Sequence, residues 1–138
     1  MQAREMGETR VDRLFLVEPG KISGVIHGSL ANKSNSRKIV TVRGRPMIIK
    51  SKEAREYEEK FRIAVLGSAC GTVEGEKLYL KATVYQENMR RDLDVELLPD
   101  LLQKNGVIRN DRQIWEKHYV RQLDKLNPRV EFEIGVVA

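Results

Sequence analysis

The sequence predicts a small α+β domain in which two helices pack on one sheet. Three observations lead to this class. The chain has 138 residues and is 41% hydrophobic, which is enough for one compact core. Strand-like runs occur near both ends and in the middle of the chain. Two further segments have the apolar spacing of amphipathic helices.

The first predicted strand covers residues 11–17 (V-D-R-L-F-L-V), a run of apolar and aromatic side chains that Pro19-Gly20 stops. Residues 1–10 are polar and charged, and we expect them to form a flexible segment before a domain at 11–138. A stretch containing Gly, Ser and Asn follows at 23–36, with Val25-Ile26 as its one apolar pair.

A hairpin is predicted next. Residues 38–42 and 46–49 are short β-like runs separated by Arg43-Gly44-Arg45. Gly44 can supply the positive φ of a tight turn, so two arginines would lie at the hairpin tip.

A helix should follow the hairpin. Ser51 can cap its N-terminus, and a glutamate in the first turn suits the positive end of the helix dipole. The apolar stripe recurs at helical spacing and consists of Tyr57, Phe61, Ala64 and Val65. Gly67 and Gly71 are expected to end the helix.

The second half contains the clearest strand of the chain. Residues 76–86 alternate between apolar and polar side chains, as a half-buried strand does. A short helix fits 95–104, and Asn105-Gly106 suits its C-terminus. Closing strands are predicted at 114–120 and 129–137.

Positive charge is concentrated in one segment. The formal net charge is +5, yet Pro19 to Lys52 contains eight Lys or Arg residues and no Asp or Glu. The remaining 17 basic residues are outnumbered by 20 acidic ones. A solvated surface would explain such a segment too, but a concentrated field of one sign is typical of a site for a polyanion.

Several classes of protein are disfavoured. Cys70 is the single cysteine, so neither a disulfide framework nor a thiolate metal site is expected. The N-terminus lacks the apolar core of a signal peptide, and no apolar run approaches the length of a membrane span. We therefore expect a soluble protein of a reducing compartment, with no membrane partner and no organic cofactor.

Asp92 and Asp94 are the candidate reactive groups. They follow the predicted strand two residues apart, and both would project from one face if the backbone there is extended. Two carboxylates that close repel each other unless a cation neutralises them, and a divalent, oxygen-preferring ion such as Mg²⁺ suits them. Asp111 would add a third carboxylate if the helix returns the chain to the same strand end.

An Asp-x-Asp pattern alone is more often a solvated turn than a metal site. Here Arg90-Arg91 precedes the pair directly and offers phosphate contacts. Glu96 and Asp100 are further carboxylates nearby, and Glu96 is a candidate ligand.

Several runs resemble the RusA family of Holliday junction resolvases. They are residues 90–94 (R-R-D-L-D), 100–102 (D-L-L) and 106–114 (G-V-I-R-N-D-R-Q-I), together with 33–37 (K-S-N-S-R), the hairpin and the helix after Ser51. The resemblance covers roughly 29–134, most of the chain, and the order and spacing of several elements match.

The resemblance implies that Asp92, Asp94 and Asp111 are catalytic, metal-binding carboxylates. It further implies a RusA-like homodimer that uses Mg²⁺ or Mn²⁺ and nicks two strands of a four-way DNA junction symmetrically, in recombination and repair. An isologous dimer presents two equal sites to such a two-fold substrate. Small resolvases of this type are often phage-encoded, so a cytoplasmic protein of a bacterium or phage is expected.

The match departs from the family after the aspartate pair. Better-known members have Asn next and a catalytic Lys one helical turn later, whereas this chain has Val95 and then Glu96 or Leu98. The positive charge would then come from Lys50, Lys52 or Arg91. Asn110 also stands where the family often has an acidic residue.

Charge and position select the candidate DNA contacts, which are Lys33, Asn35, Arg37, Arg43, Arg45, Arg90 and Arg91. Two alternatives remain beside junction resolution. One is an endonuclease whose preferred branched DNA is a fork or flap. The other is a junction-binding protein that cleaves weakly because the lysine is missing.

Overall fold

The computed structural model describes residues 11–30 and 37–138. Its elements, in chain order, are β1 (Arg13–Glu18), β2 (Lys21–His27), β3 (Arg37–Val42), β4 (Arg45–Lys50), α1 (Lys52–Ser68), β5 (Leu78–Gln86), α2 (Leu97–Lys104), a 3₁₀ turn η3 (Asp111–Gln113), β6 (Ile114–Leu123) and β7 (Arg129–Val136). The expected flexible segment at residues 1–10 lies outside the described residues.

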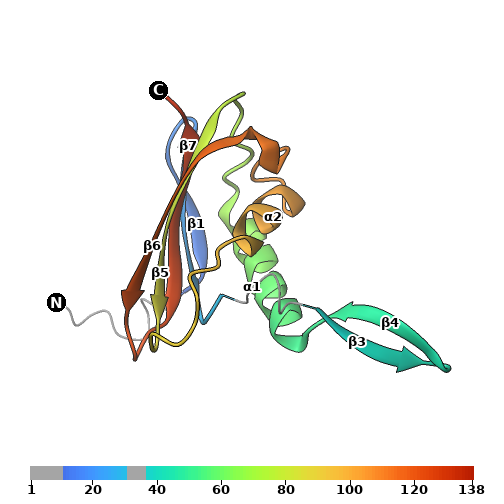
Figure 1. Cartoon of the computed structure of the whole chain (residues 1–138). Coiled ribbons are helices and arrows are strands. Elements are labelled where there is room, and N and C mark those ends of the chain that lie inside the picture. Colours follow the sequence, from blue (N-terminus) through green and yellow to red (C-terminus); the bar gives the residue numbers. More distant parts are fainter. Residues whose placement is uncertain (1–10, 31–36) are drawn as a thin grey trace.

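Five strands form one mixed sheet in the order β1-β2-β7-β5-β6, and both α-helices lie against one face of it (Figure 1). This is the expected small α+β arrangement of a sheet with two helices. β5 and β6 run parallel, with Leu78 opposite Ile114 and Gln86 opposite Leu123. A parallel pair needs a crossover connection, and α2 lies within it. The described helices are too short or too polar to span a membrane.

The core lies between the sheet and the helices. Alternate β5 residues from Leu78 to Val84 are buried, which confirms the expected strand and its inward face. Tyr57, Phe61 and Ala64 of α1 are buried too. The ring of Phe61 stacks on that of Phe132 in β7, with centroids 6.0 Å apart.

β2 occupies part of the stretch at 23–36, for which no strand was expected. Ile22 and Ile26 are buried, but Gly24 separates them and hides the alternation. A side chain at position 24 would collide with the ring of Phe132, which fills the space beside this glycine. Tertiary packing therefore favours glycine within a strand.

The predicted hairpin is confirmed as β3 and β4. Arg43 and Gly44 both have positive φ, 52° and 80°, as a two-residue hairpin turn of type I′ requires.

Ser51 caps α1 as expected, because its side chain accepts a hydrogen bond from the amide of Ala54. The helix continues through Gly67 and ends at Ser68, followed by Ala69 in the left-handed region.

The remaining predicted elements are also present. α2 covers most of 95–104, and Gly106 follows it with a φ of 75°. The amide of Val107 donates to the carbonyl of Leu102, which closes this end of the helix. β6 extends the strand predicted at 114–120 by three residues.

Candidate functional site

The aspartate pair lies in the loop between β5 and α2. β5 ends at Gln86, six residues before Asp92, so the pair is not on extended strand backbone. The amide of Asp94 donates to the carbonyl of Asp92 at 3.1 Å, which makes a tight turn. The condition under which both side chains would share a strand face is therefore not met.

Three hydrogen bonds hold this loop in place. Gln86, which is 7% exposed, donates through its side-chain amide to the carbonyl of Asp92 at 3.4 Å. One carboxylate oxygen of Asp94 accepts from the amide of Glu96 at 3.1 Å, just before α2. The guanidinium of Arg121 on β6 donates to the carbonyl of Arg91 at 3.1 Å. Asp92 is exposed and Asp94 is half-buried.

β6 presents three side chains toward this loop. Lys117, Tyr119 and Arg121 alternate along the strand and pair in register with buried, helix-facing residues of β5. The ammonium of Lys117 lies 3.3 Å from a carboxylate oxygen of Glu96. Lys117 and Arg121 were not among the residues expected at the site; the period-two spacing of residues 117, 119 and 121 is the signal that could have found them.

Two buried polar atoms near this loop have no hydrogen-bond partner in the described part of the chain. They are the side-chain oxygen of Gln86 and the hydroxyl of Tyr119. Burial raises the pKa of Tyr119 above its ordinary value, and the carboxylate of Glu96 raises it further. Tyr119 is therefore a neutral hydrogen-bonding group at physiological pH.

Asp111 lies away from the pair. It begins η3, directly before β6. Its backbone amide donates to the side-chain oxygen of Gln103 near the end of α2. Asp94 precedes the other end of α2, which spans eight residues, about 12 Å at the rise of an α-helix. The expected return of Asp111 to the same strand end is wrong within one chain, because β6 runs parallel to β5 (Figure 1).

No group of three or more His, Cys, Asp or Glu side chains that could hold a metal ion occurs within residues 11–30 and 37–138. The carboxylates of Asp92 and Asp94 nevertheless have the chemistry that Mg²⁺ accepts. This ion often uses only one or two protein carboxylates and takes its other ligands from water and substrate phosphates. The donor set fits such a partly open site.

The three cations considered as substitutes for a catalytic lysine have different surroundings. Lys50 lies 2.7 Å from Glu58, which also pairs with Lys104 at 2.9 Å. Lys52 is on the exposed first turn of α1. Arg91 directly precedes the aspartate pair and lines a recess with it, so it is the one of the three beside Asp92 and Asp94.

The candidate DNA contacts divide into two groups. Arg43 and Arg45 are exposed at the tip of the β3–β4 hairpin, whereas Arg90 and Arg91 lie in the aspartate loop. Arg37 begins β3. Lys33 and Asn35 lie outside the described residues, as does the side chain of Arg37.

Part of the acid-free segment at 19–52 lies beside the aspartate loop. Ser29 and Leu30, which follow β2, line the same small recess as Arg91, Asp92 and Asp94. An adjoining cleft of about 440 Å³ runs between this loop and the first turns of α1. Its charged lining residues are the carboxylates Glu53, Glu56 and Glu87 and the cations Lys60 and Arg91.

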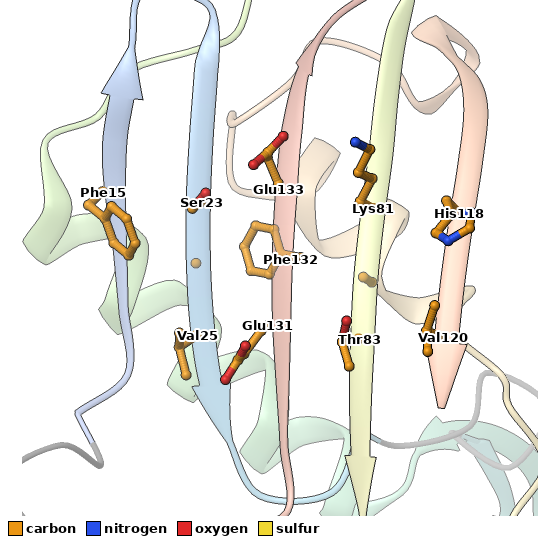
Figure 2. Close-up of a pocket in the computed structure, with 12 residues that line it drawn as sticks. Phe15, Ser23, Val25, Lys81, Thr83, His118, Val120, Glu131, Phe132 and Glu133 are labelled. Atoms are coloured by element: carbon orange, nitrogen blue, oxygen red, sulfur yellow. The ribbon is translucent and has the colours of Figure 1, made fainter. Parts of the chain in front are cut away.

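The other face of the sheet carries a shallow hollow of about 500 Å³ (Figure 2). Its two carboxylates, Glu131 and Glu133, each accept a hydrogen bond from a neighbouring side chain. Tyr79 donates to Glu133 at 2.5 Å, and Arg129 donates to Glu131 at 2.7 Å. This mixed polar surface contains neither the aspartate pair nor the exposed arginines, so it is not the candidate site.

Fold and loop together define a small α+β domain with a carboxylate pair bordered by arginines and by cations from β6. No protein-family model matches this sequence, and no curated protein matches it.

Proposed function

We propose that this protein is a Mg²⁺-dependent endonuclease that acts as a homodimer and resolves four-way DNA junctions by paired nicks. The observation that carries this proposal is the recess shared by the aspartate pair and Ser29-Leu30. The acid-free basic segment thus passes directly beside Asp92 and Asp94. A phosphate backbone attracted by that segment would come close to the carboxylates.

Asp92 and Asp94 would hold the ion. A bound Mg²⁺ polarises a phosphoryl oxygen and lowers the pKa of a nearby water. Arg90 and Arg91 would bind the phosphates on either side of the scissile bond, since guanidinium groups form paired hydrogen bonds with phosphate oxygens. Lys117 would supply positive charge at the transition state, in place of the lysine that the resembled family carries one helical turn after its aspartate pair.

The basic side chains among the candidate DNA contacts would set the affinity for DNA rather than a sequence preference. Contacts to phosphates position a complex without reading its bases. If about six basic side chains neutralise phosphates, the logarithm of the affinity should fall with the logarithm of salt concentration at a slope of about −5.

The test is a cleavage assay on labelled four-way junction, replication fork and linear duplex in Mg²⁺, with wild type and Asp92→Asn. We expect paired nicks on the junction that are lost in Asp92→Asn, while that variant still binds the junction. Preferential cutting of forks or flaps would favour an endonuclease for those branched DNAs. Tight binding without nicks in Mg²⁺ or Mn²⁺ would favour a junction-binding protein that cleaves weakly.

A further inference from the structure

The β3–β4 hairpin projects from the body of the protein (Figure 1). We call it the ribbon. Four of its large apolar side chains are at least 44% exposed: Ile39 (73%), Ile48 (67%), Met47 (48%) and Val42 (44%). Its base is joined to α1 by the ion pair of Lys50 with Glu58.

An isolated two-stranded hairpin is marginally stable in water, because it has no second layer to bury its side chains. Ile39 and Ile48 pair directly across the two strands and so form one apolar patch on one ribbon face. The neighbouring pair, Val40 and Met47, lies on the opposite face, and Val40 is half-buried. A grouped, exposed apolar patch marks an interaction surface.

The charge of the ribbon identifies its partner. Residues 37–50 contain five Lys or Arg residues, no Asp and no Glu. Arg43 and Arg45 extend beyond the isoleucine pair toward the tip. A second copy of the ribbon would be repelled by this charge, whereas a nucleic acid duplex complements it. Two-stranded β-ribbons are also known to enter the major or the minor groove of DNA.

We propose that the ribbon enters the minor groove of the DNA beside the branch point, with Arg43 and Arg45 on the flanking phosphates and the Ile39–Ile48 face against the bases. The apolar pair parts the neighbouring base step there, as apolar side chains inserted from the minor groove do. This inference rests on the proposed DNA substrate. It assigns the ribbon a role in opening the base stack, beyond that of phosphate binding.

The test uses a four-way junction with 2-aminopurine at the base steps next to the branch, since the fluorescence of this base rises when it is unstacked. The variant is Ile39→Thr with Ile48→Thr. The matched control is Val40→Thr with Met47→Thr on the opposite face. Threonine suits exposed strand positions, so both ribbons should fold, which circular dichroism and thermal unfolding would check.

We expect wild type and control to raise the fluorescence. The Ile39→Thr, Ile48→Thr variant should leave it near the level of free DNA and bind the junction about tenfold more weakly, as expected for the loss of buried apolar contacts. Equal fluorescence increases from the variant and wild type would overturn the inference.

Two further outcomes separate this inference from the proposed function. If wild type nicks the junction but does not raise the fluorescence, the ribbon proposal fails and the endonuclease proposal stands. If wild type neither binds nor nicks branched DNA, both fail. Sedimentation without DNA tests whether a second copy of the chain covers the ribbon instead. A dimer that the isoleucine substitutions convert to monomer would show this, and it would also overturn the inference.

Discussion

The ammonium of Lys117 lies 3.3 Å from a carboxylate oxygen of Glu96, and this ion pair links β6 to the loop that carries Asp92 and Asp94. Both side chains are more than one-third exposed, at 39% and 51%. An exposed pair of this kind contributes little to stability, about 0–1 kcal/mol. Its interest is its position, because Glu96 or Leu98 stands where the family that the sequence resembles carries its catalytic lysine.

Replacing Lys117 tests whether β6 supplies that cation. We expect Lys117→Met to lower the rate of junction nicking by about 100-fold, the effect of removing one charged group that stabilises a transition state. Lys117→Arg should keep most of the rate, and Lys125→Met, in the exposed turn after β6, should leave it unchanged. Single-turnover nicking with saturating protein measures the step directly. An unchanged rate in Lys117→Met would contradict this assignment.

Asp94 has a structural contact that Asp92 lacks among the described residues, since its side chain accepts from the amide of Glu96. We expect Asp94→Ala to lower the free energy of unfolding by about 1 kcal/mol, the net worth of one hydrogen bond. Asp94→Asn retains an acceptor oxygen and should be nearly neutral, as should Asp92→Ala. Urea denaturation measures all three. If Asp94→Asn also abolishes nicking, the carboxylate charge is needed beyond this contact.

The separation of Asp111 from the pair predicts complementation between subunits. If Asp111 serves the proposed site, it must do so from a partner, because α2 separates it from Asp94 within one chain. Asp92→Asn and Asp111→Asn should then be inactive alone, whereas mixed dimers of the two restore one complete site and nick one strand. Nicked product from the mixed sample measures this. Failure of the mixture to restore nicking would place Asp111 outside a shared site.

Glu58 predicts a pH dependence of stability. Burial would raise its pKa, but hydrogen bonds from Lys50 and Lys104 lower it below the ordinary value of 4.5. A lowered folded-state pKa stabilises the fold above the unfolded-state pKa, and this contribution is lost as pH falls through the folded-state value. Wild type should therefore unfold at a higher temperature than Glu58→Gln at neutral pH, with the difference disappearing in acid.

The control for this experiment is Glu56→Gln. Glu56 is exposed and lies 4.0 Å from Lys52, so its substitution should change the unfolding temperature little at any pH. A Glu58→Gln difference that persists at acid pH would show that the substitution acts through packing rather than charge.

Local patterns predicted most of the secondary structure. Ser51 capped a helix, Arg43-Gly44 made a tight turn, and the alternation of β5 placed Leu78 to Val84 inward, because each depends on neighbours in the sequence. β2 was missed because the space beside Gly24 is filled by Phe132, which is more than 100 residues away along the chain. No local pattern contains that contact.

The sequence by itself determined a small α+β domain, a basic segment without acidic residues and an aspartate pair preceded by arginines. Only the tertiary structure decided which groups surround that pair. Parallel pairing of β6 with β5 moved Asp111 to the far end of α2 and brought Lys117 and Arg121 to the loop. Strand direction and order depend on burying the whole sheet face at once, so spacing along the chain could not reveal which side chains meet.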